Sequence, residues 1–163
     1  MKTLLLMRHA KSSWAAPGLA DHDRPLNERG ETASFRMGRL LVERNLRPDV
    51  LLHSTALRAV QTAHRVAKAA GLTVSLEAWR ELYLAPPHTY IELAQDLPSD
   101  VECALLIGHN PGLEELVSSL SGLEQHVPTA ALAEVRLSVA TWSDLTLSPR
   151  PKAVRLFRPK ELD

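Results

Sequence analysis

The chain has 163 residues, a length typical of one domain, and 45% of them are hydrophobic and 23% charged. This composition excludes a disordered or fibrous protein. Nineteen basic and nineteen acidic residues give a net charge of zero, which argues against a protein that binds nucleic acid through a dominant basic surface. We therefore expect residues 1–163 to form a single domain with no nucleic-acid partner.

The sequence carries no signal for export or membrane insertion. Cys103 is the single cysteine, so no disulfide can form within the chain. The apolar run 3–7 is too short for the core of a secretory signal. No run approaches the ~20 apolar residues of a transmembrane helix. We expect a soluble, cytoplasmic protein with no membrane partner.

Short apolar runs alternate with segments of helical periodicity along most of the chain. The apolar runs are too short for helices and predict strands at 3–7, 50–52, 73–76 and 104–107. Helical spacing of apolar residues predicts helices at 27–45, 54–70, 88–95 and 110–120. Asn27, Ser54 and Asn110 are the expected N-caps, and Pro111 is expected at the first position of the last helix. Two further strands are predicted at 131–139 and 153–157.

Alternating strands and helices indicate βαβ units, and therefore an α/β fold: a three-layer α/β/α sandwich with a mostly parallel central sheet. In such sheets, ligands bind just beyond the carboxyl ends of the strands. The first strand runs into Arg8 and His9, and the fourth runs into Gly108 and His109. The second strand leads into a helix whose first turn holds Arg58. We expect these side chains to meet at one edge of the sheet.

This set of groups suits a phosphoryl ligand. Guanidinium groups bind phosphate oxygens bidentately, and a helix N-terminus adds unpaired N–H donors. A neutral histidine can attack phosphorus, while a second histidine can stabilise the charge that develops on the oxygens. No Gly-rich loop ending in Gly-Lys-Ser/Thr is present, so nucleotide-driven transfer of that kind is not expected.

At these residues the sequence resembles the histidine phosphatase superfamily, the phosphoglycerate mutase-like proteins with an Arg-His-Gly (RHG) motif, and within it the SixA-type phosphohistidine phosphatases. The resemblance covers nearly the whole chain. It is carried by residues 4–12, 24–30, 54–62, 81–83, 108–112 and 128–130. It implies a phosphoglycerate mutase-like fold without a large lid insertion.

The resemblance also implies roles for individual residues. His9 matches the nucleophile that becomes a phosphohistidine intermediate, and Arg8, Arg58 and His109 match the rest of the phosphate pocket. Glu81 lies where larger relatives place a proton donor, although a solvated loop acid is an equal alternative.

Three residues of the first loop are relevant to which substrate is bound and how. Lys11 and Ser12 could bind substrate from this loop, or could serve a local turn. Ala10 replaces the glycine of the broad family motif. That replacement resembles the SixA branch and shifts the expected substrate to phosphohistidine.

We therefore expect a metal-independent phosphatase, without a cofactor, that hydrolyses phosphohistidine on a protein such as a histidine-containing phosphotransfer domain. The short chain leaves little room for a lid, which favours a bulky substrate. One alternative is hydrolysis of a small phosphate ester, such as a sugar phosphate or nucleotide. An alternative of another class is a catalytically silent module that binds phosphoprotein.

Two charged segments receive no functional role. The Asp-His-Asp run at 21–23 has too few neighbouring ligands for a metal site and is interpreted as a solvated loop. The basic residues near the C-terminus could contact an acidic partner, but a solvent-facing strand is the favoured interpretation. They are Arg150, Lys152, Arg155, Arg158 and Lys160.

Overall fold

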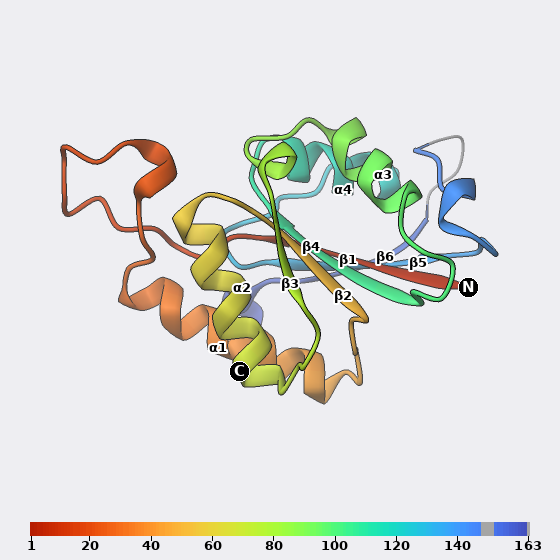
Figure 1. Cartoon of the computed structure of the whole chain (residues 1–163), viewed down its shortest axis with the longest axis horizontal. Helices are drawn as coiled ribbons and strands as arrows, with labels where there is room; N and C mark the ends of the chain where they lie inside the picture. The colour runs from red at the N-terminus through yellow and green to blue at the C-terminus, as the bar shows by residue number, and fades with distance from the viewer. Residues whose placement is uncertain (148–151, 163) are drawn as a thin grey trace.

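A six-stranded mixed sheet runs through the middle of the computed structural model, which describes residues 1–147 and 152–162 (Figure 1). In chain order the strands are β1 (Lys2–Arg8), β2 (Val50–Ser54), β3 (Leu76–Trp79), β4 (Cys103–Gly108), β5 (Leu132–Leu137) and β6 (Ala153–Phe157). Their order across the sheet is β3-β2-β4-β1-β5-β6. β1 to β4 pair in parallel, and β5 runs antiparallel to both of its neighbours. The mostly parallel sheet expected from the sequence is therefore confirmed.

The central strands β1 and β4 are covered on both faces. Their apolar residues are fully buried, which is why these strands are continuous apolar runs and do not alternate with polar residues. Successive side chains of a strand point to opposite faces. Leu5 and Met7 therefore pack in one core cluster, while Leu4 and Leu6 pack in the other.

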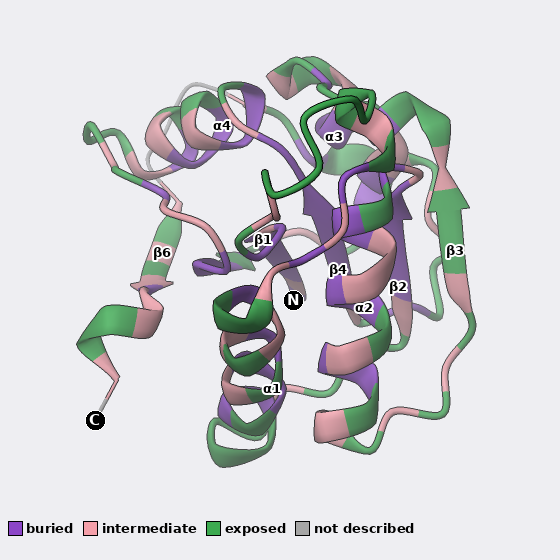
Figure 2. Ribbon diagram, turned by 90° about the vertical axis from the view of Figure 1, so that its left-hand side faces the viewer, coloured by how far each residue is buried: buried purple, intermediate pink, exposed green. Residues whose placement is uncertain are grey.

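Helices cover both faces of the sheet. α1 (Glu28–Glu43) and α2 (Leu57–Ala70) lie on one face, and α3 (Pro87–Gln95) and α4 (Gly112–Ser121) lie on the other (Figures 1 and 2). This arrangement confirms the three-layer α/β/α sandwich. Within the part of the chain that the structure describes, no helix is long and apolar enough to span a membrane.

Element boundaries depart from the sequence prediction at two helices. Asn27 caps α1 as expected, because its side chain accepts a hydrogen bond from the N–H of Gly30. Ser54 does not cap α2, which begins at Leu57, because the Ser54 hydroxyl is held at the end of β2 by the N–H of Ala56. Asn110 does not cap α4, which begins at Gly112.

The third strand is shifted towards the C-terminus from the predicted 73–76. β3 lies at the edge of the sheet, and Glu77 and Ala78 are exposed. The burial pattern therefore does not determine where β3 lies in the sequence. Its position is determined by pairing with β2, which places Leu51 opposite Leu76 and Ser54 opposite Trp79.

The predicted strands near the C-terminus form β5 and β6. β6 matches its predicted bounds, and β5 is shorter than predicted. A 3-10 helix, Pro159–Glu161, follows β6. Of the basic residues noted there, Arg150 lies outside the described residues.

Gly38 lets α1 pack closely against α2. A Cβ atom at this position would lie 2.6 Å from the carbonyl oxygen of Val66 and 2.6 Å from the Cβ atom of Ala69. We expect Gly38→Val to lower the free energy of unfolding by about 1–3 kcal/mol through overpacking, measured by urea denaturation. Thr32→Val, at an exposed position of the same helix, should change it by less than about 0.5 kcal/mol. Equal stability of the two variants would contradict this packing account.

Candidate active site

The carboxyl ends of β1 and β4 and the first turn of α2 bring two histidines and two arginines together. Arg8 is the last residue of β1, His9 follows it, and His109 follows β4. Because Arg8 pairs with Gly108 in adjacent parallel strands, the two histidines leave the sheet side by side. Their ring centroids are 5.0 Å apart. Arg58, in the first turn of α2, reaches both rings.

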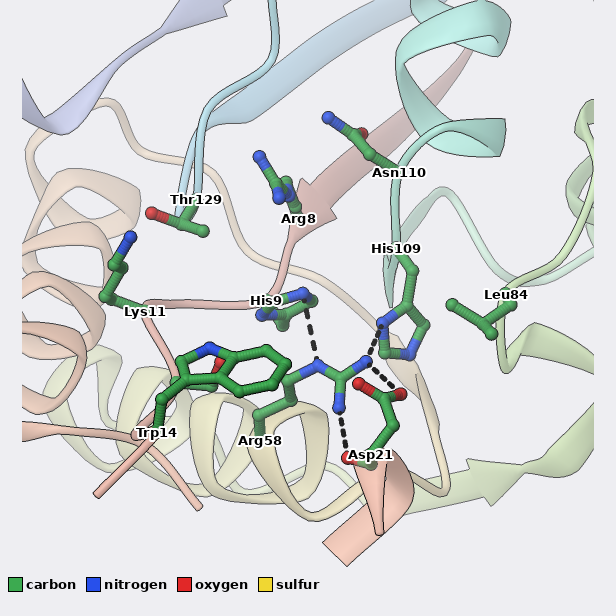
Figure 3. A pocket seen from close by; sticks show the side chains of 11 residues that line it. Arg8, His9, Lys11, Trp14, Asp21, Arg58, Leu84, His109, Asn110 and Thr129 are labelled. Atoms are coloured by element: carbon green, nitrogen blue, oxygen red, sulfur yellow. Dashed lines mark hydrogen bonds and ion pairs between the residues drawn. The ribbon is translucent and has the colours of Figure 1, made fainter. Parts of the chain in front are cut away.

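These side chains line a pocket of about 240 Å³ (Figure 3). Lys11 and Ser12, two further residues expected from the sequence, also line it. The remaining lining residues were not assigned to a site from the sequence. They are Trp14, Asp21, Leu84, Asn110 and Thr129.

Glu81 is not among the residues that line the pocket. It lies in a short 3-10 helix, Arg80–Leu82, and its side chain is exposed. After this helix, Tyr83 stacks edge-on against the ring of His109, and Leu84 lines the pocket.

Hydrogen bonds fix the tautomer of His9. Its Nδ1 lies 2.7 Å from the carbonyl oxygen of Ala10, and the Nε atom of Arg58 donates to its Nε2 over 3.3 Å. Since a guanidinium only donates, Nε2 is the unprotonated nitrogen and Nδ1–H donates to Ala10. Burial, reinforced by the charges of Arg58 and Arg8, lowers the pKa of His9 to about 4. His9 is therefore a neutral imidazole with its lone pair on Nε2.

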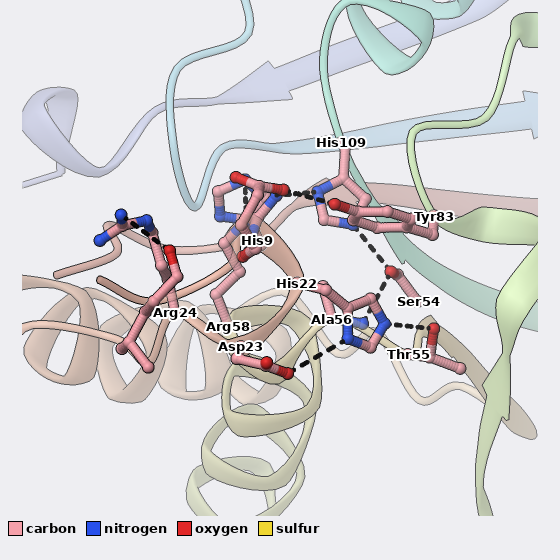
Figure 4. A network of polar contacts seen from close by, with 12 residues as sticks. His9, His22, Asp23, Arg24, Ser54, Thr55, Ala56, Arg58, Tyr83 and His109 are labelled. Atoms are coloured by element: carbon pink, nitrogen blue, oxygen red, sulfur yellow. Dashed lines mark hydrogen bonds and ion pairs between the residues drawn. The ribbon is translucent and has the colours of Figure 1, made fainter. Parts of the chain in front are cut away.

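The same guanidinium fixes the tautomer of His109. Nη2 of Arg58 donates to Nδ1 of His109 over 3.3 Å, so the proton of His109 is on Nε2 and is donated to Oγ of Ser54 over 2.7 Å (Figure 4). Burial, followed by the proximity of His9 and Arg58, lowers the pKa of His109 to about 3. Ser54, the expected helix cap, is instead the residue that orients His109.

Arg8 lines the pocket and carries a buried N–H donor without a partner among the described residues. Its Nη1 donates to the carbonyl oxygen of Val127 over 3.2 Å, whereas its buried Nε has no hydrogen-bond partner among the described residues. An unsatisfied buried donor is costly, by about 1–3 kcal/mol.

Asp21 is the functional residue that sequence reasoning missed. Its carbonyl oxygen accepts from Nη1 of Arg58 over 2.7 Å, and its Oδ2 accepts from Nη2 over 3.0 Å. The hydroxyl of Tyr83 donates to the same Oδ2. The hydrogen bond from Tyr83, reinforced by that from Arg58, lowers the pKa of Asp21, so it is a carboxylate. Only the folding of the loop onto α2 shows this role, because nothing in the sequence links Asp21 to Arg58.

A single hydroxyl holds the loop after His9 against α2. Oγ1 of Thr62 accepts from the N–H of Ala10 over 3.0 Å and donates to the carbonyl oxygen of Arg58 over 2.6 Å. Thr62 is fully buried. It therefore couples the backbone beside His9 to the backbone that carries Arg58.

The residues next to Asp21 make contacts within the loop and with the segment before α2. Nε2 of His22 lies 2.9 Å from Oγ1 of Thr55, and Nδ1 of His22 lies 3.7 Å from the Asp23 carboxylate. No group of three or more His, Cys, Asp or Glu side chains within residues 1–147 and 152–162 is arranged to hold a metal ion.

Known proteins match both the sequence and the fold. The family model "Histidine phosphatase superfamily (branch 1)" matches residues 4–105. An uncharacterised protein of Mycobacterium tuberculosis is 35% identical over 151 residues, which cover 85% of this chain and 91% of the relative. A structure from Agrobacterium tumefaciens that carries the name phosphohistidine phosphatase SixA is 34% identical, covers 84% of this chain and 92% of that one, and has a TM-score of 0.76. The protein histidine phosphatase SixA complexed with tungstate is 26% identical over 99% of both chains, with a TM-score of 0.83.

The chain therefore belongs to the histidine phosphatase superfamily, and it is a phosphatase. Within that superfamily it is of the SixA type, with the phosphoglycerate mutase-like fold and no large insertion. This class disfavours the alternative of a catalytically silent module.

The lowered pKa of His9 makes a prediction that NMR can test. An imidazole with a pKa of about 4 stays neutral from pH 8 down to about pH 5, whereas an ordinary histidine, with a pKa of about 6.5, is almost fully protonated at pH 5. We expect the Cε1–H resonance of His9, assigned by its loss in His9→Gln, to keep its position over that range. A titration midpoint near pH 6.5 would rule out the neutral imidazole deduced here.

The contact between Asp21 and Arg58 predicts a loss of activity in Asp21→Asn. The variant removes the carboxylate that orients the guanidinium, and we expect kcat to fall about tenfold because the donors of Arg58 are no longer held in place. Phosphate release is the measurement. Asp23→Asn removes a neighbouring carboxylate that does not line the pocket and should retain wild-type kcat. Wild-type kcat in Asp21→Asn would show that Arg58 needs no such support.

Proposed function

We propose that the protein hydrolyses phosphohistidine on a protein substrate, without a metal ion, through a covalent phosphohistidine intermediate on His9. The observation that carries this proposal is the unprotonated Nε2 of His9, buried between three groups that can bind phosphoryl oxygens: Arg8, Arg58 and His109.

In the first step, Nε2 of His9 attacks phosphorus in line with the leaving nitrogen. The Nε2–P bond forms as the P–N bond of the substrate breaks, and the electron pair of that bond goes to the departing imidazole nitrogen. This nitrogen takes a proton from water. The dephosphorylated histidine of the substrate then leaves.

Charge on the transferring phosphoryl group is stabilised by fixed donors. Nε of Arg8 has no other partner among the described residues, and Arg58 lies against both rings. Such preorganised donors are the main source of catalysis when little covalent chemistry is needed. The negative phosphoryl group also opposes the effect of Arg8 and Arg58 on the pKa of His109, which favours a protonated, donating His109 in the complex.

In the second step, water hydrolyses the intermediate. The water oxygen bonds to phosphorus, the Nε2–P electron pair returns to His9, and phosphate leaves. One proton is released to solvent and balances the one taken up in the first step. His9 is again a neutral imidazole with Nδ1–H held by Ala10.

The exposed position of Glu81 helps to distinguish between a phosphohistidine and a phosphate ester as the substrate. An imidazole leaving group can already carry a proton, so a phosphoramidate needs less help from a general acid than a phosphate ester does. Glu81 is exposed and does not line the pocket, so the proposal assigns the leaving-group proton to water and not to Glu81. This arrangement supports phosphohistidine over an unactivated ester.

The rim of the pocket supports a protein-borne substrate. Trp14 and Leu84 line the pocket and are 66% and 53% exposed, and Lys11 is exposed as well. A pocket whose lining residues are open to solvent can admit a side chain that projects from a folded protein, such as a histidine-containing phosphotransfer domain.

We expect His9→Ala to lose at least about 1000-fold in phosphate release from a phosphohistidine-bearing protein, because the covalent route is removed. The wild-type enzyme, quenched in acid-free denaturant, should carry radioactive phosphate on His9, and a chelator should not change its rate. His88→Ala, an exposed histidine that does not line the pocket, is the matched control. Turnover in His9→Ala, or a requirement for a divalent metal, would refute the mechanism. Hydrolysis of small esters alone would favour the small-ester alternative.

A further inference from the structure

A second groove lies beside the phosphate pocket. Its volume is about 1040 Å³, against about 240 Å³ for the pocket, and the two share Arg8, Lys11 and Thr129. Residues of α1 and residues 158–161, which follow β6, are among those that line the groove. A molecule whose phosphoryl group occupies the pocket can therefore continue directly into the groove.

Positive charge dominates this groove. Its basic lining residues are Arg8, Lys11, Arg29, Arg36, Arg158 and Lys160, and its acidic ones are Glu28 and Glu161. Glu161 is paired with Arg158, with 3.5 Å between Nη1 and Oε2. Lys11, Arg29 and Lys160 are exposed and form no ion pair with any carboxylate in the described part of the chain. The groove thus concentrates uncompensated cations in a chain whose net charge is zero.

We propose that this groove binds an acidic segment of the substrate protein, next to the phosphohistidine held in the pocket. The proposal rests on the proposed function and specifies the partner. Complementary charge along such a groove speeds encounter and selects partners, more than it adds affinity.

The size and lining of the groove favour a polypeptide over other anions. A small phosphate ester would occupy the pocket and leave the groove largely unused, given their volumes. Ala33, Pro128 and Pro159 also line the groove, and their apolar groups suit the backbone and side chains of a peptide. Single-stranded nucleic acid needs aromatic platforms for its bases, and the ring of His126 is the only one among the described lining residues.

The groove also divides the basic C-terminal residues into two sets. Arg158 and Lys160 line the groove, whereas Arg155 is exposed on β6 and does not line it. A solvent-facing strand, the interpretation favoured from the sequence, therefore applies to Arg155 and not to Arg158 and Lys160. That they line the same groove as residues of α1 is a feature of the tertiary fold.

Two phosphohistidine peptides of equal length test the proposal. One has Asp and Glu on both sides of the phosphohistidine, and the other has Asn and Gln. At low ionic strength we expect the wild-type enzyme to hydrolyse the acidic peptide with a kcat/KM about tenfold higher, since exposed charge pairs are individually weak and screened by salt. The double variant Arg29→Glu with Lys160→Glu should abolish this preference.

Controls separate the groove from the chemistry and from net charge. The double variant Arg47→Glu with Lys68→Glu makes the same charge change at exposed residues outside the groove, and it should keep the preference. Free phosphohistidine, which has no acidic flank, should lose far less kcat/KM in Arg29→Glu with Lys160→Glu than the acidic peptide loses.

Results that contradict the groove proposal differ from those that contradict the proposed function. Equal hydrolysis of both peptides by the wild type, or a preference that survives in Arg29→Glu with Lys160→Glu, would overturn the groove proposal and leave the proposed function intact. Competition by an RNA oligonucleotide stronger than that by the unphosphorylated acidic peptide would also overturn it. If no form of phosphohistidine is hydrolysed while a small ester is, the proposed function itself fails.

Discussion

The guanidinium of Arg58 is the group on which the chemistry of the site depends. It donates to Nε2 of His9 and to Nδ1 of His109, and it can do so only if both nitrogens are unprotonated. One side chain therefore sets the tautomers of both histidines, while burial and the nearby cations keep both rings neutral. The N–H of Arg58 occupies the Nε2 lone pair of His9 in this structure, so in the proposed mechanism that hydrogen bond opens before Nε2 attacks phosphorus.

The scaffold makes this arrangement possible by bringing three separate parts of the chain to one point. β1 and β4 are adjacent and parallel, so the residues that follow them leave the sheet together. The Thr62 hydroxyl then fixes the distance between the loop after β1 and the first turn of α2. The positions of the site residues thus depend on the sheet register and on one buried hydrogen-bonding group.

Much of this fold and site could be predicted from the sequence, because buried parallel strands are continuous apolar runs and chemical groups follow them directly. Arg8, His9, Arg58 and His109 were found in this way. Glu81 was linked to the site by motif position, but it does not line the pocket, whereas Leu84, after the 3-10 helix that carries Glu81, does. Asp21 and the orienting role of Ser54 could not be predicted, because each depends on a contact between residues distant in sequence. The position of β3 was set by pairing with β2 at an exposed edge, where hydrophobic pattern carries little information.

The hydrogen bonds between Asp21 and Arg58 affect how tightly the pocket can bind free phosphate, the product. Any oxyanion that enters the pocket must compete with a carboxylate and a carbonyl group for the N–H donors of Arg58. Free phosphate carries the full cost of that competition, because it makes no contact outside the pocket. A substrate that is also held along its flank can offset the cost. The contacts of Asp21 with Arg58 therefore weaken the binding of a free oxyanion by that guanidinium.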